Sequence, residues 1–372
     1  MIGSDRLPPL VFGPAYLDRV VRVDRPLIDP SVGNRALDRS VDGSWAGPGG
    51  GLIVTDPLGN RIVVELPSFW MGPTGRIAIS RPLAEEEPGW SWTVRALSWA
   101  EDLGGMGSGF AAALGGELVS VLGPRDDPLS LRIAGMLASA GVVHHPVRVA
   151  GTAADWTLLF SSGEHGDKLP IGFRGCHASA ASLQPWSGRP SGLRVVAALP
   201  NRLSAEALGG PARVRMFAPA PRNMIDRDPP VSAFAESVDV LCCNRGEWES
   251  LPDREEVAWR VSILAVTDGP NGAVLRFTTP EGEVGRLEVP AFPRSLPPRD
   301  TNRAGEAFAS TLIATLIGAG WTPGVTPPGL IRLAAERASA AAALVLDRTG
   351  FGFPTPGEVD AAIRSGRVDA PG

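Results

Sequence analysis

Residues 300–308, Asp-Thr-Asn-Arg-Ala-Gly-Glu-Ala-Phe, decide how the rest of this chain is interpreted. An apolar run follows at 309–319, so the stretch predicts a loop that enters a helix, with the small residues Ala304 and Gly305 at its mouth. The first amides of a helix have no internal partners, and together with the helix dipole they favour an anion. Glu306 places a carboxylate in the same turn, where it could take a proton from an attacking hydroxyl. The pattern therefore indicates phosphoryl transfer to an alcohol.

Composition limits the class of protein. The 372 residues are enough for one large α/β domain or two small ones, and 44% hydrophobic with 20% charged residues is typical of a globular chain. A net charge of −5 without any basic run argues against a nucleic-acid partner. Lys168 is the only lysine, so chemistry that needs a lysine has one candidate.

The cysteines and the apolar runs predict a compartment. Three cysteines, of which Cys242 and Cys243 are adjacent, do not make a disulfide framework. The first residues lack the basic-then-apolar plan of a signal peptide, and the longest apolar run is too short to span a bilayer. We therefore expect a reduced, cytoplasmic protein without a membrane partner.

Two kinds of periodicity divide the chain. Residues 24–103 contain short alternating runs between Gly-rich linkers, which predicts antiparallel strands at 51–55, 61–66, 76–80 and 91–97. A first apolar strand precedes them and ends near Gly13. From residue 104 onward strands alternate with helices, which predicts a mostly parallel sheet with helices on both faces. Those strands are expected at 118–122, 193–198, 214–218, 238–242 and 263–267, and helices at 110–118 and 129–140.

The opening stretch resembles the C-terminal signature of the ribokinase/PfkB-type sugar and nucleoside kinases, Asp-Thr-x-Gly-Ala-Gly-Asp. Four residues match it: Asp300, Thr301, Ala304 and Gly305. Glu306 stands where that family has its catalytic Asp, and Arg303 where it has a small residue, usually Gly.

For the phosphoryl site, the resemblance implies that Glu306 is the base and that the amides of 304–306 face the γ-phosphoryl group. Asp300 and Thr301 belong to the nucleotide side. Arg303 supports two opposite expectations, since its guanidinium could add a donor for the phosphate or fill the space that Gly leaves. Glu306 could instead be an acid that only stabilises the first helical turn.

For the fold, the resemblance implies a three-layer α/β ribokinase-like fold. Its core would be 1–23 and 104–372, and 24–103 would be an enlarged β lid over the substrate. Five of the ten tryptophans fall in this insertion: Trp45, Trp70, Trp90, Trp92 and Trp99. A small sheet cannot bury five indoles alone, so they indicate extra core under the lid, a homodimer contact through the lid, or stacking on a sugar.

On the substrate side, the resemblance implies that Asp18 binds acceptor hydroxyls, unless it is a solvated loop residue. Residues 104–109, Gly-Gly-Met-Gly-Ser-Gly, resemble the family's Gly-Gly-x-x-x-Asn segment, which assigns Gly104, Gly105 and Gly109 to substrate binding. A flexible turn before a helix explains the same glycines. Gly109 replaces the expected Asn.

Three further segments invite comparison with the family. Residues 122–128 are similar to its Gly-x-Asp-Asp turn, with a structural role. Arg174 lies where a substrate-side Arg is frequent, although the sequence favours a surface Arg there. Ala218 and Ala220 stand where Asp and Asn are frequent.

On the nucleotide side, Asn244-Arg245-Gly246-Glu247 resembles the Asn-x-x-Glu motif, which implies that Asn244 and Glu247 organise Mg²⁺ through water beside ATP. The same spacing is also that of a helix capping box. Thr267, Gly269 and Gly272 match the Thr-x-Gly-x-x-Gly turn that lines the nucleotide site, and a plain β-hairpin is the alternative.

Two functions stay open from the sequence. The first is an ATP- and Mg²⁺-dependent kinase of a sugar, sugar acid or nucleoside. The second is a catalytically impaired relative that binds a ligand or a protein partner, for which Arg303, Glu306 and Gly109 are the marks.

Overall fold

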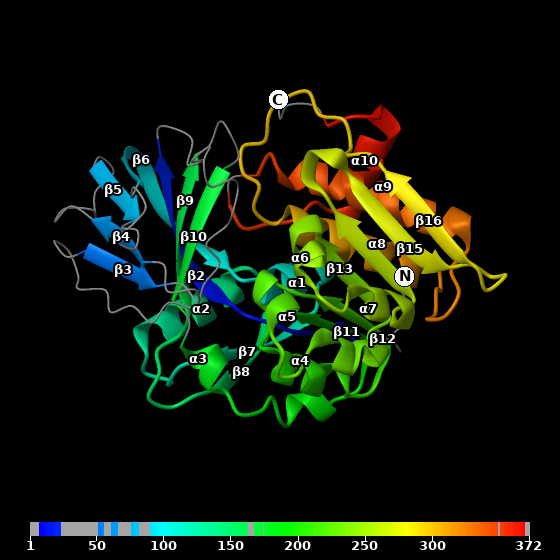
Figure 1. Ribbon diagram of the computed structural model, residues 1–372, viewed down its shortest axis with the longest axis horizontal. Helices are drawn as coiled ribbons and strands as arrows, with labels where there is room; N and C mark the ends of the chain where they lie inside the picture. The colour runs from blue at the N-terminus through cyan, green and yellow to red at the C-terminus, as the bar shows by residue number, and fades with distance from the viewer. Residues whose placement is uncertain are drawn as a thin grey trace.

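A nine-stranded sheet forms the centre of the molecule (Figure 1). The computed structural model describes residues 7–23, 51–55, 61–65, 76–81, 90–162, 167–173, 175–348 and 350–368. The strand order is β16-β15-β14-β13-β12-β11-β1-β7-β8, and every pair from β14 to β8 is parallel, whereas β14, β15 and β16 pair antiparallel. These strands are β1 Leu10–Phe12, β7 Glu117–Leu122, β8 Val143–Arg148, β11 Ser191–Ala197, β12 Ala212–Ala218, β13 Val240–Asn244, β14 Ile263–Thr267, β15 Ala273–Thr278 and β16 Val284–Val289.

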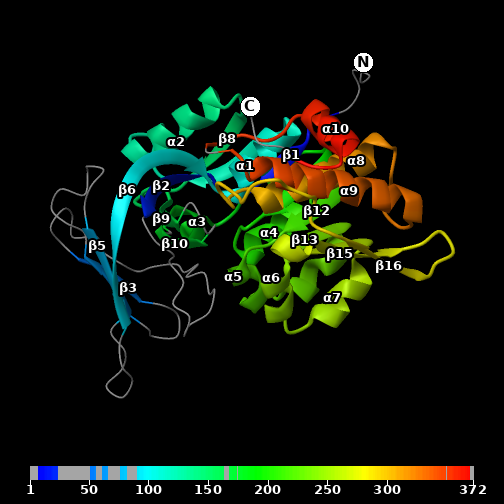
Figure 2. The ribbon, with the colours of Figure 1, turned by 90° about the horizontal axis from the view of Figure 1, so that it is seen from above.

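Helices cover both faces of this sheet (Figure 2). One face carries α1 Met106–Leu114, α2 Pro128–Ser139, α8 Ala304–Gly318 and α9 Pro328–Val345, with α10 Pro356–Ser365 packed on α9. The other face carries α3 Cys176–Ser179, α4 Asn201–Leu208 and α7 Arg254–Arg260. Two short helices, α5 Pro221–Ile225 and α6 Arg245–Ser250, follow β12 and β13. The predicted three-layer α/β architecture is confirmed.

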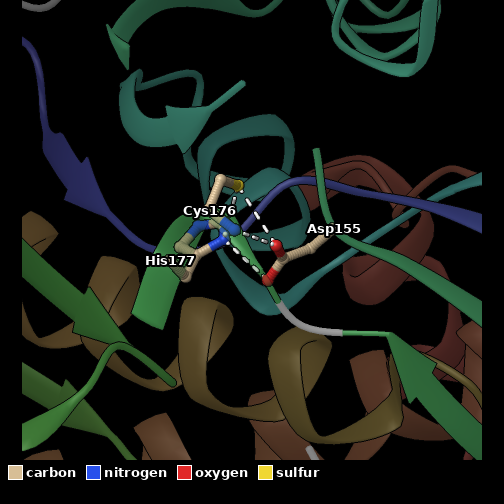
Figure 3. Close-up of side chains that lie close together, drawn as sticks. All are labelled: Asp155, Cys176 and His177. Atoms are coloured by element: carbon tan, nitrogen blue, oxygen red, sulfur yellow. Dashed lines mark hydrogen bonds and ion pairs between the residues drawn. The ribbon is translucent and has the colours of Figure 1, made fainter. Parts of the chain in front are cut away.

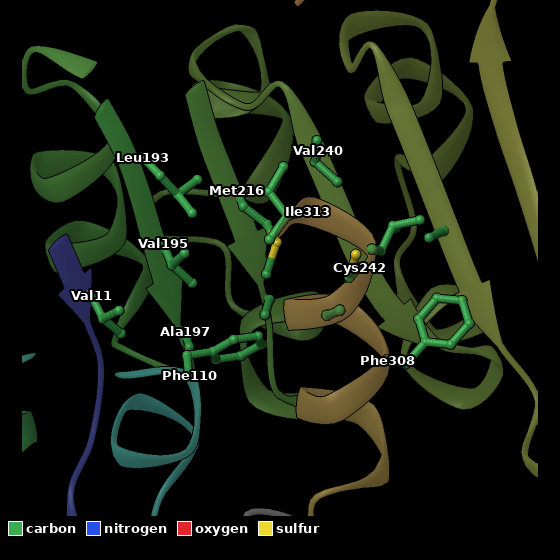
Figure 4. Packing of buried hydrophobic residues seen from close by; sticks show 14 of the residues in the cluster. Val11, Phe110, Leu193, Val195, Ala197, Met216, Val240, Cys242, Phe308 and Ile313 are labelled. Carbon is green, nitrogen blue, oxygen red and sulfur yellow. The ribbon is translucent and has the colours of Figure 1, made fainter. Parts of the chain in front are cut away.

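Strand alternation explains the two layers. Successive side chains of a strand point to opposite faces, so a strand buried on both sides is apolar throughout. On β11, Val195 packs with the α1 and α8 layer, whereas Val196 packs with the α4 and α7 layer. Figure 4 shows the first of these cores, in which Phe110 of α1 and Ile313 of α8 lie over the central strands.

A second, seven-stranded sheet lies beside the core, in the order β10-β9-β2-β6-β5-β4-β3 (Figure 1). Its strands are β2 Tyr16–Val23, β3 Gly51–Thr55, β4 Arg61–Glu65, β5 Arg76–Arg81, β6 Trp90–Gly104, β9 Trp156–Ser162 and β10 Asp167–Phe173. The antiparallel strands expected within 24–103 are present. The sheet also takes in β2, β9 and β10, which the sequence division placed in the core, because β2 pairs with both β6 and β9. Strand pairing between distant segments is a tertiary event that periodicity does not reveal.

The helix expected at 110–118 is displaced, because α1 begins at Met106 and ends at Leu114. Glycines are poor helix formers, which led to the later start. Packing overrides that preference, since a Cβ on Gly107 would lie 2.4 Å from the carbonyl carbon of Gly13. Gly107 thus lets α1 approach the end of β1.

Candidate functional site

Two adjoining cavities lie at the carboxyl ends of the parallel strands, where ligands of open α/β sheets usually bind. The Asp18 cavity, of about 400 Å³, is lined by residues that include Asp18, Asp155 and His177. The Thr301 cavity, of about 320 Å³, is lined by residues that include Thr301 and Phe308. Five residues line both cavities: Met106, Asn244, Glu247, Asn302 and Glu306. Glu306 and the two members of the Asn-x-x-Glu motif therefore lie where the cavities meet.

The loop into α8 turns sharply at Arg303. Its backbone is left-handed, with φ of 68°, and α8 begins at the next residue. This is a conformation that glycine adopts freely and other residues adopt at a cost. The geometry therefore explains why the related signature has Gly at this position.

Arg303 uses its side chain for ion pairs within the protein. Nη1 lies 3.0 Å from Oδ2 of Asp102, near the end of β6, and Nη2 lies 3.7 Å from Oδ2 of Asp300. Arg303 lines the Thr301 cavity, and its side chain is mostly buried. Of the two expectations for Arg303, a free donor for a phosphate is the less compatible with this pairing.

Asp300 shapes the same loop. Its Oδ1 accepts a hydrogen bond of 2.8 Å from the backbone amide of Asn302, which closes the turn before α8. Thr301 and Gly305 line the Thr301 cavity.

Glu306 is accommodated by Gly109. A Cβ on Gly109 would lie 3.3 Å from Cγ of Glu306 and 3.2 Å from Cζ of Phe353. These two side chains occupy the space that a residue larger than glycine at position 109 would need. The departures at 109 and 306 are thus linked in space, because the longer acid takes up room that an Asn would need.

Asn244 and Glu247 form a reciprocal capping box at the start of α6. Oδ1 of Asn244 accepts from the amide of Glu247 at 2.9 Å, and Oε2 of Glu247 accepts from the amide of Asn244 at 2.8 Å. The capping interpretation is therefore confirmed. Each carboxylate or amide oxygen can accept a second bond, so both side chains can still meet a hydrated cation in the cavities that they line.

Thr267 and the turn after it form the hairpin between β14 and β15. Thr267 lines the Thr301 cavity. Gly272 has φ of 90°, and a Cβ there would lie 2.0 Å from the carbonyl oxygen of Val289, so only glycine fits. Gly269 also has a positive φ, of 51°. These glycines shape the hairpin and lie outside both linings in the described part of the chain.

At the Asp18 cavity, Asp18 lies on β2 beside Asp102 of β6 and Thr157 of β9. A Cβ on Gly104 would lie 2.1 Å from Cγ of Asp18, so Gly104 makes room for that carboxylate. Gly105 lines the Asp18 cavity and has φ of 90°.

Not every predicted site residue in the described part of the chain lines one of the two cavities. Within the described ranges, the two linings do not include Asp300, Ala304, Gly104 or Gly109. Ala218 lines the Thr301 cavity and Ala220 the Asp18 cavity. Arg174 and the side chains of the five insertion tryptophans lie outside the described residues.

Sequence reasoning missed a buried cluster of Asp155, Cys176 and His177 (Figure 3). Oδ1 of Asp155 accepts from the amides of Gly175 and Cys176, both at 2.9 Å, and from the Cys176 thiol at 3.1 Å. Nδ1 of His177 lies 3.0 Å from Oδ2 of the same carboxylate. Burial and the charge of Asp155 raise the pKa of the Cys176 thiol, which stays protonated.

The available signal for this cluster was weak. His177 is one of four histidines and lies three residues after Arg174, which the sequence analysis considered. Asp155 precedes it by about twenty residues, and the tertiary structure brings both to the lining of the Asp18 cavity.

No protein-family profile matches the chain. The bifunctional protein HldE of Halorhodospira halophila (strain DSM 244 / SL1) is 29% identical over 342 residues, 84% of this chain. The chain spans 65% of the length of that relative. No helix in the described ranges has the length and apolar character needed to cross a membrane.

Solved structures of similar shape cover nearly all of the chain. A ribokinase from Giardia lamblia has a TM-score of 0.63 at 17% identity, covering 96% of this chain and 99% of its own. A nucleoside kinase from Burkholderia thailandensis in complex with inosine has a TM-score of 0.60 at 15% identity, covering 96% and 98%. A ribokinase from Cryptococcus neoformans var. grubii serotype A in complex with ADP has a TM-score of 0.59 at 16% identity, covering 96% and 99%.

Proposed function

Because this chain has the ribokinase-like fold, we propose that it is a kinase that transfers a phosphoryl group from ATP to a hydroxyl of a sugar, sugar acid or nucleoside. The observation that carries the proposal is the position of Glu306, in the first turn of α8 and at the junction of the two cavities. A nucleotide in the Thr301 cavity and an acceptor in the Asp18 cavity would meet at this carboxylate. Solved structures of the same fold in complex with ADP and with inosine support the binding of a nucleotide and of a nucleoside by a protein of this fold.

In this mechanism the protein positions the reactants and stabilises charge. Glu306 takes the proton of the attacking hydroxyl, for which a carboxylate at the contact of both reactants is suited. The amides at the start of α8, with the helix dipole, favour the negative charge of the transferring group. Asp18 would accept hydrogen bonds from acceptor hydroxyls.

Asn244 and Glu247 would hold Mg²⁺ through water, because they offer an amide and a carboxylate oxygen at the wall of the Thr301 cavity. When bound, Mg²⁺ neutralises phosphate charge. The sheet formed by β2 to β6, β9 and β10 is proposed as the lid, and a homodimer through it stays a prediction.

Replacing Glu306 tests the proposal. We expect Glu306→Gln to lower kcat by about 10²-fold or more, since general base catalysis typically contributes 10²–10⁴-fold. We expect Glu306→Asp to retain part of the rate, because the carboxylate is retracted by one methylene. The assay is Mg-ATP-dependent phosphorylation of a panel of sugars and nucleosides.

The matched control is Glu358→Gln, which alters the same residue type in the first turn of α10. It should leave kcat unchanged. If Glu306→Gln lowers stability by about 0.3–1 kcal/mol, as loss of a helix-dipole contact would, without lowering kcat, Glu306 is a structural residue and the assigned base is wrong.

Nucleotide binding without transfer is the alternative function. The pairing of Arg303 with Asp102 and Asp300 favours it, because a guanidinium held by two carboxylates adds little net charge for a phosphate. ATP binding by calorimetry together with no transfer to any acceptor of the panel would support this function over the kinase.

A further inference from the structure

Asp155 and His177 form a fixed pair on the wall of the Asp18 cavity. Their exposed fractions are 1% and 4%, so the pair is nearly closed off from solvent. Asp155 is held by the amides of Gly175 and Cys176, and in turn holds the imidazole of His177 through Nδ1. The rings of Tyr16 and His177 pack in a T-shaped arrangement, with centroids 5.5 Å apart. The ring orientation is therefore fixed before any ligand binds.

The contact with Asp155 determines the tautomer of His177. A carboxylate only accepts hydrogen bonds, so the proton lies on Nδ1 and a neutral ring has its lone pair on Nε2. Nε2 is buried and has no hydrogen-bond partner within the described ranges. Buried polar atoms are almost always paired, so an orphaned acceptor beside a ligand cavity calls for a donor.

We propose that His177 binds the phosphate acceptor, with Nε2 accepting a hydrogen bond from one of the acceptor's hydroxyl groups. This inference rests on the proposed kinase function, because only a kinase has a phosphate acceptor. His177 lines only the Asp18 cavity of the two, so it acts on the acceptor and not on the nucleotide. The ligand class is a neutral polyol, sugar or nucleoside, whose O–H can donate to a lone pair.

The same three residues could be considered as ligands of a metal ion, since their ligand atoms lie within 4.8 Å of one another. The hydrogen bonds oppose this use. Oδ1 of Asp155 already accepts from two amides and a thiol, and the Cys176 thiol donates its proton to it. A metal would have to displace these bonds and ionise the thiol.

Two substitutions separate binding from structure. His177→Asn keeps a donor for Asp155 at the position of Nδ1 but removes the group at Nε2. His177→Gln can place an amide oxygen near Nε2 and restore an acceptor. Ribose and inosine are the probes, with 2-deoxyribose and 2′-deoxyinosine as analogues that lack one hydroxyl.

We expect His177→Asn to lower kcat/KM for ribose or inosine by roughly 10- to 100-fold, the range for one lost hydrogen bond to a buried group. His177→Gln should recover part of this loss, and the calorimetric Kd for ATP should change in neither variant. If the deleted hydroxyl is the one that His177 contacts, the loss shrinks for the deoxy analogue. An unchanged kcat/KM in a folded His177→Asn protein, or an equal loss of ATP affinity, overturns the inference.

A measurement without ligand keeps the two proposals distinguishable. Imidazole ¹⁵N spectra of a protein with four histidines can assign each tautomer, and His177→Asn identifies the signal. A proton on Nδ1 with Nε2 bare supports the assignment, and a proton on Nε2 overturns it even if transfer is observed. Zn²⁺ binding that is lost in both Cys176→Ala and His177→Asn would also overturn it, in favour of a metal site. Failure of every probe to be phosphorylated counts against the kinase function and leaves the tautomer result to decide the role of His177.

Discussion

Arg303 has a backbone conformation that destabilises the folded state and a side chain that forms an ion pair. Its left-handed φ of 68° is unfavourable for any side chain, while its guanidinium pairs with Asp102 at 3.0 Å. A left-handed residue with a Cβ costs about 1–2 kcal/mol relative to glycine. The ion pair therefore offsets a backbone conformation that the loop imposes.

At the residue scale, we predict that Arg303→Gly is more stable than Arg303→Ala by about 1 kcal/mol, because both lose the ion pair but only Gly relieves the backbone. Equilibrium unfolding in urea measures the difference. Arg132→Ala, which removes a surface partner of Glu101, is the control and should change the unfolding free energy by less than about 1 kcal/mol. Equal stability of the two Arg303 variants would contradict the strain argument.

At the element scale, Asp127 determines where α2 begins. Its Oδ2 accepts from the amide and the hydroxyl of Ser130, at 2.9 and 2.7 Å, and caps the helix. The same atom accepts from the amide of Ala154 at 2.9 Å, which ties α2 to the segment before β9. The turn that resembled a structural family motif thus has an observed structural role.

We predict that Asp127→Ala lowers the unfolding free energy by about 1–2 kcal/mol, the usual value of a lost N-cap. Burial alone would raise the pKa of Asp127, but the hydrogen bonds from Ser130 and Ala154 outweigh it and the pKa is lowered. The contribution of a lowered pKa is present above the unfolded value, about 3.9, and is lost as pH falls through the folded pKa. The difference between wild type and variant should therefore shrink below about pH 4.

Urea unfolding at neutral and acidic pH checks this. Asp126→Ala is the matched control, because Asp126 is the exposed neighbour of Asp127. A control that destabilises as much as Asp127→Ala would show that the effect comes from general charge and not from the cap.

At the scale of the whole molecule, β6 joins the second sheet to the core. It runs from the insertion strands to Gly104, directly before α1 (Figure 2). Near its end Asp102 meets Arg303, which is 201 residues away in sequence. One ion pair thus connects the proposed lid with the loop that begins α8.

We predict that Asp102→Asn raises hydrogen–deuterium exchange at residues 300–306, because the loop loses its contact with the second sheet. Glu101→Gln is the matched control on the same strand, since Glu101 pairs with Arg19 and Arg132 and not with the loop. Mass spectrometry of the peptides that contain 300–306 measures the change. Equal exchange in both variants would show that Asp102 does not hold the loop.

Much of the secondary structure could be predicted from short-range sequence patterns. The apolar strands from 118 to 267 and the start of α8 were predicted within a few residues, because period-2 runs and turn residues are local signals. The start of α1 was placed too late, since the packing of Gly107 on Gly13 overrides helix propensity.

The sequence alone determined the alternation of strands and helices, the resemblance of residues 300–306 to a phosphoryl-transfer signature, and the candidate residues Asp18, Asn244 and Glu306. Only the tertiary structure decided that Arg303 pairs with Asp102, that Gly109 gives room to Glu306, and that His177 and Asp155 share a cavity with Asp18. The physical reason is that side-chain partners are chosen by strand pairing and packing between distant segments. Periodicity reports which face of an element is buried, and carries no information about what that face meets.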